Sequence, residues 1–147
     1  MTAMNILIAD DYDDNRELLR LLLESSGHVA SEARDGRECV ALARRELPDL
    51  VLIDLSMPKL DGWETLRELR ADERTRHIPC AALTAFASVQ DRRRALQAGF
   101  DGYLAKPFRA SELHELVGRL LANALTKDRK SFSPEAKLIR EVDNAEE

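Results

Sequence analysis

Aspartate, threonine and lysine side chains directly follow four short apolar segments of this sequence. Asp10 and Asp11 follow the segment NILIA, and Asp54 follows the segment LVLI. Thr84 follows CAAL, and Lys106 follows GYLA. If the four segments are neighbouring parallel strands, their carboxyl ends bring these five side chains to one edge of a sheet. The sequence therefore predicts one polar site and not five unrelated surface residues.

Three carboxylates at one site repel one another unless a proton or a cation compensates their charge. Two unit charges ~4 Å apart repel by ~4 kcal/mol at an effective dielectric of about 20. Oxygen ligands with open positions favour Mg²⁺, which keeps several waters and shares its coordination shell with phosphate. The Lys106 ammonium and the Thr84 hydroxyl beside the carboxylates suit a phosphoryl group in transfer. Asp54 would be the nucleophile.

Strands and helices must alternate along the chain to position this site. The strand segments are short and mostly apolar, as buried parallel strands are, apart from a weaker edge strand at 29–33. The expected strands cover 5–9, 29–33, 50–53, 80–83 and 102–105. Helical patterns cover 14–26, 36–46, 62–72, 88–98 and a last helix with one apolar face, formed by Leu113, Leu116, Val117, Leu120 and Leu121. Five βα units in a row predict an α/β fold with a parallel sheet covered on both faces.

The composition is that of a soluble globular protein. The 147 residues are 44% hydrophobic and 33% charged, and the net charge of −5 argues against a general affinity for nucleic acid or anionic membrane. The start of the chain does not look like a secretory signal, and Cys39 and Cys80 do not have the spacing of metal ligands, so we expect a cytoplasmic protein. We expect one domain over 1–124 and a charged extension over 125–147, disordered or a marginal helix.

Four segments of the chain resemble the signature segments of response-regulator receiver domains from two-component signalling. They are ILIADD, LVLIDLSMPKLDG, PCAALTA and GYLAKPF, and the resemblance runs from about residue 5 to residue 122. It implies a (βα)5 doubly wound, CheY-like fold with the strand order 2-1-3-4-5, which flavodoxin shares. It also implies a stand-alone response regulator that signals by binding a protein and turns over no substrate beyond its own phosphorylation and dephosphorylation.

The resemblance also implies roles for the residues around the acceptor. Asp54 would take the phosphoryl group from a histidine kinase or a histidine phosphotransfer protein. Asp11 and Asp54 would bind Mg²⁺ or Mn²⁺ directly, together with the backbone carbonyl of Ser56, and Asp10 would act largely through water. Ser56 and Phe86 occupy the positions that tune the lifetime of the acyl phosphate in this family, and a large Phe86 would favour a long lifetime.

Further roles implied by the resemblance concern the switch. Lys106 would pair with the phosphoryl group, and a cis peptide bond to Pro107 would point the lysine into the site. Thr84 would move toward a phosphoryl oxygen, and Tyr103 would turn inward into the vacated space. The surface that reads out this change would be the fourth helix, fifth strand and fifth helix, which would bind a protein. The net charge of −5 argues against nucleic acid and membrane as partners.

Two other classes of function stay open at this point. One is a receiver-like interaction module that works without phosphate, although such proteins usually lose the acceptor, the lysine or an acidic-pair residue. The other is a Mg²⁺-dependent phosphatase or phosphotransferase with an aspartyl-phosphate intermediate. Enzymes of that class normally have a second carboxylate two residues after the nucleophile, where this chain has Ser56.

Some residues near the site also have ordinary structural interpretations. We assign Trp63 and Phe108 to packing, because nothing in their spacing indicates chemistry. Asp13 and Asp14 stand at the expected start of the first helix and could cap it. This capping would leave Asp10 and Asp11 available for the predicted site.

Overall fold

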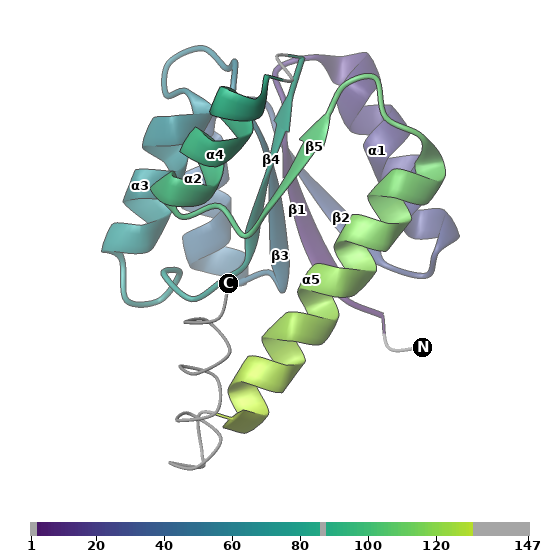
Figure 1. Ribbon diagram of the computed structural model, residues 1–147, viewed down its shortest axis with the longest axis vertical. Coiled ribbons are helices and arrows are strands. Elements are labelled where there is room, and N and C mark those ends of the chain that lie inside the picture. Colours follow the sequence, from purple (N-terminus) through teal and green to yellow (C-terminus); the bar gives the residue numbers. More distant parts are fainter. Residues whose placement is uncertain (1–2, 86–87, 131–147) are drawn as a thin grey trace.

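A five-stranded parallel sheet forms the centre of the protein, in the order β2-β1-β3-β4-β5 (Figure 1). The computed structural model describes residues 3–85 and 88–130. The strands are β1 (Asn5–Ala9), β2 (Val29–Ala33), β3 (Leu50–Asp54), β4 (Cys80–Thr84) and β5 (Gly102–Ala105). This order confirms the prediction. The four strands at whose carboxyl ends the polar residues lie, β1, β3, β4 and β5, are therefore neighbours in the sheet.

Five helices cover the two faces of the sheet. They are α1 (Asp13–Ser25), α2 (Gly36–Glu46), α3 (Gly62–Ala71), α4 (Val89–Ala98) and α5 (Ala110–Lys130). Helices α1 and α5 pack on one face, and α2, α3 and α4 pack on the other (Figure 1). Among residues 3–85 and 88–130, no helix combines the length and the apolar character needed to cross a membrane.

Two strands are one residue longer than the sequence indicated. Asp54 is the last residue of β3 and pairs with Leu83, and Thr84 is the last residue of β4 and pairs with Ala105. The expected strands ended one residue earlier because the apolar runs LVLI and CAAL end there. Both side chains therefore project from rigid strand positions and not from loops.

The helix boundaries also moved by small amounts. Helix α1 begins and ends one residue earlier than expected, and α3 ends one residue earlier. Helix α4 begins at Val89, because Ser88 is its N-cap and accepts a hydrogen bond from the Asp91 N–H. Helix α5 continues to Lys130, and positions 131–147 of the expected extension lie outside the described residues.

The core follows the apolar pattern of the sequence. The predicted face of α5 is buried, as are the alternating side chains of β1, of which Ile6 and Ile8 face α1 and α5. Cys39 and Cys80 are free and buried on the opposite face of the sheet. Burial raises the pKa of Cys80 to about 12, so this thiol is protonated and unreactive at neutral pH.

Gly36, the first residue of α2, lies tightly against the segment that leads into α3. A Cβ atom at this position would lie 2.2 Å from the Leu60 carbonyl oxygen and 2.3 Å from Thr65 Oγ1. Since a backbone atom cannot rotate away, we expect Gly36→Ala to lower the free energy of unfolding by about 2 kcal/mol, measured by urea denaturation.

The control for this prediction is Gly118→Ala, in the middle of α5. A Cβ atom there would meet nothing within 4 Å. Because glycine is unfavourable inside a helix, this change should raise the free energy of unfolding by about 0.5–1 kcal/mol. Equal effects at the two positions would contradict the steric explanation for Gly36.

Candidate functional site

Backbone hydrogen bonds extend the sheet just beyond its strands and fix the residues of the site. The Asp10 N–H donates to the Ala33 carbonyl (3.1 Å), and the Lys106 N–H donates to the Thr84 carbonyl (2.7 Å). Asp54 is the last residue of β3, and β3 lies between β1 and β4 in the sheet. The predicted residues on β1, β3, β4 and β5 therefore meet at one edge of the sheet.

The carboxylates of Asp10, Asp11 and Asp54 form one acidic cluster. One oxygen atom from each lies within 4.8 Å of the others. Asp10 and Asp54 are buried, whereas Asp11 is exposed, so the cluster has a solvent-facing side. Hard oxygen ligands with an open side fit Mg²⁺ or Mn²⁺, which keep several waters in their coordination shell.

Lys106 lies between two of these carboxylates. Its Nζ donates to Asp10 Oδ2 (3.1 Å) and to Asp54 Oδ2 (3.3 Å). Burial by itself would lower the pKa of Lys106, but the negative charges of Asp54 and Asp10 outweigh burial and raise it. The ammonium is therefore charged at neutral pH. The peptide bond between Lys106 and Pro107 is cis.

The surroundings of Asp54 disfavour the ionised form of its carboxyl group. Its Oδ1 accepts a hydrogen bond from the Ser56 N–H at 3.0 Å. Burial raises the pKa of Asp54, and the nearby Asp10 raises it further. The Ser56 hydrogen bond and the Lys106 ammonium lower this pKa without reversing the shift. A further cation at the site would therefore stabilise the ionised carboxylate.

The two expected switch residues lie between this site and α4. Thr84 is buried at the end of β4, and Tyr103 on β5 is half-buried against the core on the α2–α4 side. Burial raises the pKa of Tyr103, the nearby Asp91 carboxylate raises it further, and Arg92 opposes them. Helix α4, which carries both charged residues, contacts β5, the strand that carries Tyr103. The expected movement of the two side chains stays a prediction.

A pocket beside the site combines two predicted site residues, Ser56 and Thr84, with four residues to which the sequence assigned no chemical role. It has a volume of about 340 Å³ and is lined by Leu55, Ser56, Trp63, Thr84, Asp91 and Arg94. The Trp63 ring packs edge-on against Phe100, with centroids 5.9 Å apart, and the Arg94 guanidinium lies 4.9 Å from the Trp63 ring centre. Trp63 thus packs as expected and also lines this pocket. Phe86, the second expected lifetime residue, lies outside the described residues.

Arg16 is another residue near the site for which the sequence predicted no role. It is buried on α1, on the same face as Leu19 and Leu23. The spacing i, i+3, i+7 was a usable signal, because it places a charged residue at a core position.

The capping expected of the aspartates at the helix start is wrong, since the N-cap is Tyr12 without a side-chain cap bond, and Asp13 pairs with Arg16.

Comparison with known proteins identifies the family. The model of the response regulator receiver domain matches residues 6–118. The chain belongs to the response regulator receiver family. This receiver domain functions in two-component signalling, and the resemblance predicted from its four signature segments is confirmed.

Individual relatives cover nearly all of the described part of the receiver domain. The polar-differentiation response regulator DivK of Brucella ovis is 38% identical over 120 residues, which are 82% of this chain and 98% of DivK. The receiver domain of a Pseudomonas aeruginosa sensor histidine kinase, solved with a magnesium ion in its active-site cleft, has a TM-score of 0.76 at 38% identity and covers 82% of this chain and 99% of its own. The Vibrio cholerae chemotaxis protein CheY4 has a TM-score of 0.76 at 27% identity, with 81% and 99% covered. The fold predicted from the sequence is therefore confirmed.

Proposed function

We propose that this receiver domain accepts a phosphoryl group on Asp54 from a histidine kinase or a histidine phosphotransfer protein. The observation that carries the proposal is the position of Lys106 between two buried carboxylates, Asp10 and Asp54. One cation balances only part of the charge of three clustered aspartates. The remaining negative charge favours a divalent ion, and the ion and the lysine together suit a dianionic phosphoryl group.

In the proposed reaction, an oxygen of Asp54 attacks the phosphorus of a phosphohistidine. A P–O bond to the aspartate forms as the P–N bond to the imidazole breaks, and the imidazole nitrogen keeps the electron pair and later takes up a proton. Lys106, already within hydrogen-bond distance of Asp54, neutralises charge on the phosphoryl oxygens. The Thr84 hydroxyl would bind one of these oxygens once the group is attached.

Asp10, Asp11, Asp54 and the backbone carbonyl of Ser56 would hold the Mg²⁺ or Mn²⁺ ion. When bound, the ion offsets the negative charge that gathers on the phosphoryl oxygens. The fit depends on the three clustered carboxylate oxygens and on the exposure of Asp11, which leaves room for waters and phosphate.

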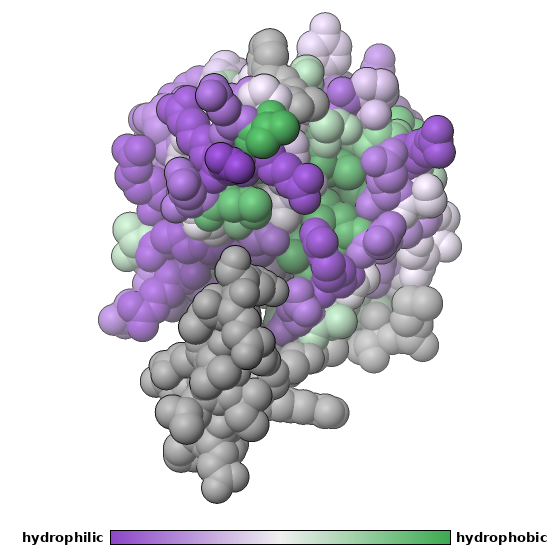
Figure 2. All heavy atoms as spheres, in the orientation of Figure 1, coloured by the Kyte–Doolittle hydropathy of each residue, from purple (hydrophilic) through white to green (hydrophobic). Residues whose placement is uncertain are grey.

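Phosphorylation would act on a partner protein through Thr84 and Tyr103. The output surface would comprise α4, β5 and α5, where Val89 is 71% exposed and Leu96 is 47% exposed. Figure 2 shows small hydrophobic areas among hydrophilic side chains on the α4 side of the view. We infer a cytoplasmic response regulator that modifies only itself. Its net charge of −5 argues against nucleic acid and anionic membrane as partners.

The test is the intact mass of the full chain after incubation with acetyl phosphate or phosphoramidate. With Mg²⁺ present, we expect the mass to increase by one phosphoryl group. No increase is expected without a divalent ion, because Asp10, Asp11 and Asp54 then keep an uncompensated charge that repels the incoming phosphate. Folded protein that gains no mass with Mg²⁺ would instead support a phosphate-independent interaction module. Multiple-turnover hydrolysis of a phosphate monoester that does not phosphorylate Asp54, such as p-nitrophenyl phosphate, would favour the phosphatase class.

A further inference from the structure

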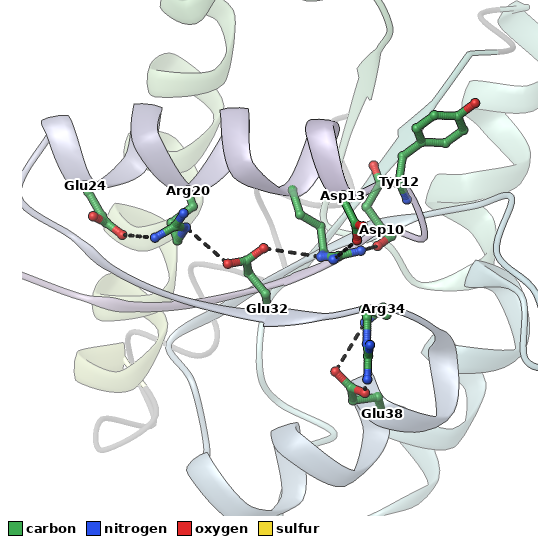
Figure 3. Close-up of polar contacts among 9 residues, drawn as sticks. Asp10, Tyr12, Asp13, Arg20, Glu24, Glu32, Arg34 and Glu38 are labelled. Carbon is green, nitrogen blue, oxygen red and sulfur yellow. Dashed lines mark hydrogen bonds and ion pairs between the residues drawn. The ribbon is translucent and has the colours of Figure 1, made fainter.

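Arg16 is buried at the point where β1 leads into α1, and only 8% of its side chain is exposed. Its Nη1 donates to the backbone carbonyl of Asp10 at 2.7 Å, and its Nε donates to Glu32 Oε1 at 3.3 Å. Its Nη2 pairs with Asp13 Oδ1. Figure 3 shows Asp13 beside Asp10 at the start of α1, and Glu32 between Arg20 and this end of the helix. One guanidinium thus joins β1, β2 and the start of α1.

Together with three other hydrogen bonds, the Arg16 contact fixes both the backbone and the carboxylate of Asp10. Its N–H donates to the carbonyl of Ala33 on β2, and its Oδ1 accepts from the Tyr12 N–H at 2.9 Å. Its Oδ2 accepts from Lys106 at 3.1 Å. The Asp10 carbonyl lies beyond the end of β1, and Arg16 is its hydrogen-bond donor. Without this donor, a backbone carbonyl in a buried residue would lose its hydrogen bond, and the segment that carries Asp10 and Asp11 would be held less firmly.

We propose that Arg16 is a positioning residue for the metal site of this receiver domain. Its hydrogen bond to the Asp10 carbonyl and its pairing with Asp13 hold the segment between them, which includes Asp11. This inference depends on the proposed function, because it assumes that Asp10, Asp11 and Asp54 hold a divalent ion. Arg16 does not itself contact the carboxylate oxygens of Asp10, so it acts through the backbone.

Positioning and simple charge predict effects of opposite sign. If Arg16 acted only as a nearby positive charge, its removal would make the site more negative and would strengthen binding of a divalent cation. Asp13 and Glu32 already neutralise the guanidinium, which reduces this contribution. If Arg16 positions the acidic pair, its removal spreads the ligands over more conformations and weakens binding.

The experiment measures Mn²⁺ binding to the unphosphorylated full chain by electron paramagnetic resonance of free Mn²⁺. Arg16→Gln removes the charge, and Arg16→Lys keeps the charge but cannot reproduce the three-way guanidinium contacts. For both variants we expect a dissociation constant raised about 10-fold over that of the wild type. Thermal unfolding without metal, recorded in parallel, sets a temperature at which every variant is folded.

Arg20→Gln is the matched control. Arg20 lies one turn further along α1, with its Nε 3.1 Å from the same Glu32 carboxylate, and its second ion pair is with Glu24 (Figure 3). It makes no contact with Asp10 among the described hydrogen bonds, so its removal should leave the Mn²⁺ dissociation constant within about twofold of wild type.

Two results would overturn the positioning role. One is tighter or unchanged Mn²⁺ binding by Arg16→Gln and Arg16→Lys in their folded states. The other is an equal loss of affinity in Arg20→Gln, which would indicate a general effect of the charges on α1. A wild-type chain that binds no Mn²⁺ would instead remove the metal from the proposed function, and that outcome is visible before any variant is measured.

Discussion

Lys106→Met is expected to lower the free energy of unfolding of the metal-free protein by about 2–3 kcal/mol at neutral pH. Methionine replaces the aliphatic part of the lysine but leaves Asp10 and Asp54 without their shared ammonium. Both carboxylates are buried, with exposed fractions of 0% and 6%. Two buried like charges without a counter-ion are unfavourable, and unfolding in water relieves the repulsion.

The effect of Lys106→Met should depend on pH in a defined direction. The folded-state pKa of Asp54 is already raised, mainly by burial, and loss of the lysine raises it further. A raised pKa contributes stability that is present below the pKa of the unfolded chain and is lost as the pH rises through the folded-state value. The difference between variant and wild type should therefore be largest near pH 7 and should shrink toward about pH 4.

Chemical denaturation across this pH range provides the measurement, and Lys59→Met provides the control. The Lys59 side chain is 66% exposed and lies 3.6 Å from Asp35. An exposed pair of this kind contributes about 0.5 kcal/mol or less, so Lys59→Met should have a small effect. A pH-independent loss in Lys106→Met would mean that the lysine matters for packing and not for charge.

Asp54→Asn should abolish phosphoryl incorporation and at the same time stabilise the protein. The amide is not a nucleophile for phosphorus, so the mass of the variant should stay unchanged with Mg²⁺ and acetyl phosphate. The raised pKa of Asp54 means that the ionised carboxylate destabilises the folded state relative to the unfolded chain. Removing that charge is expected to add about 1–2 kcal/mol to the free energy of unfolding at pH 7.

The stability gain can be measured as a thermal midpoint about 3–6 °C higher than that of the metal-free wild type. The gain should fall as the pH falls toward about 4, because the wild-type carboxyl then takes up a proton. Asp14→Asn, at an exposed position in the first turn of α1, should change stability by about 0.5 kcal/mol or less. Phosphoryl incorporation by Asp54→Asn would place the acceptor elsewhere in the chain.

The opposite signs of the two stability effects have one cause. The site gathers more negative charge than Lys106 balances, so removing the lysine increases the excess and removing Asp54 reduces it. The cost of Lys106→Met should consequently be smaller in an Asp54→Asn background, with a coupling of about 1 kcal/mol. Functional sites commonly trade stability for reactive groups in this way.

The sequence by itself determined the alternation of strands and helices, the buried face of α5 and the residue types that follow the strands. These features depend on local periodicity and on the meeting of parallel strand ends, which one chain reveals. The four signature segments then indicated the family and the strand order. The same local reasoning placed Asp54 and Thr84 one residue outside their strands, because it cannot weigh the pairing of Asp54 with Leu83 or of Thr84 with Ala105.

Only the tertiary structure decided which distant residues meet. Arg16 reaches Glu32 and the Asp10 carbonyl because α1 packs across β1 and β2, and Gly36 needs its small size because Leu60 and Thr65 come within contact of it. Local sequence pattern carries no information about such contacts, since they depend on how whole elements pack. The shared ammonium between Asp10 and Asp54 likewise depends on β5 ending beside β4, which brings together residues that are 96 and 52 positions from Lys106.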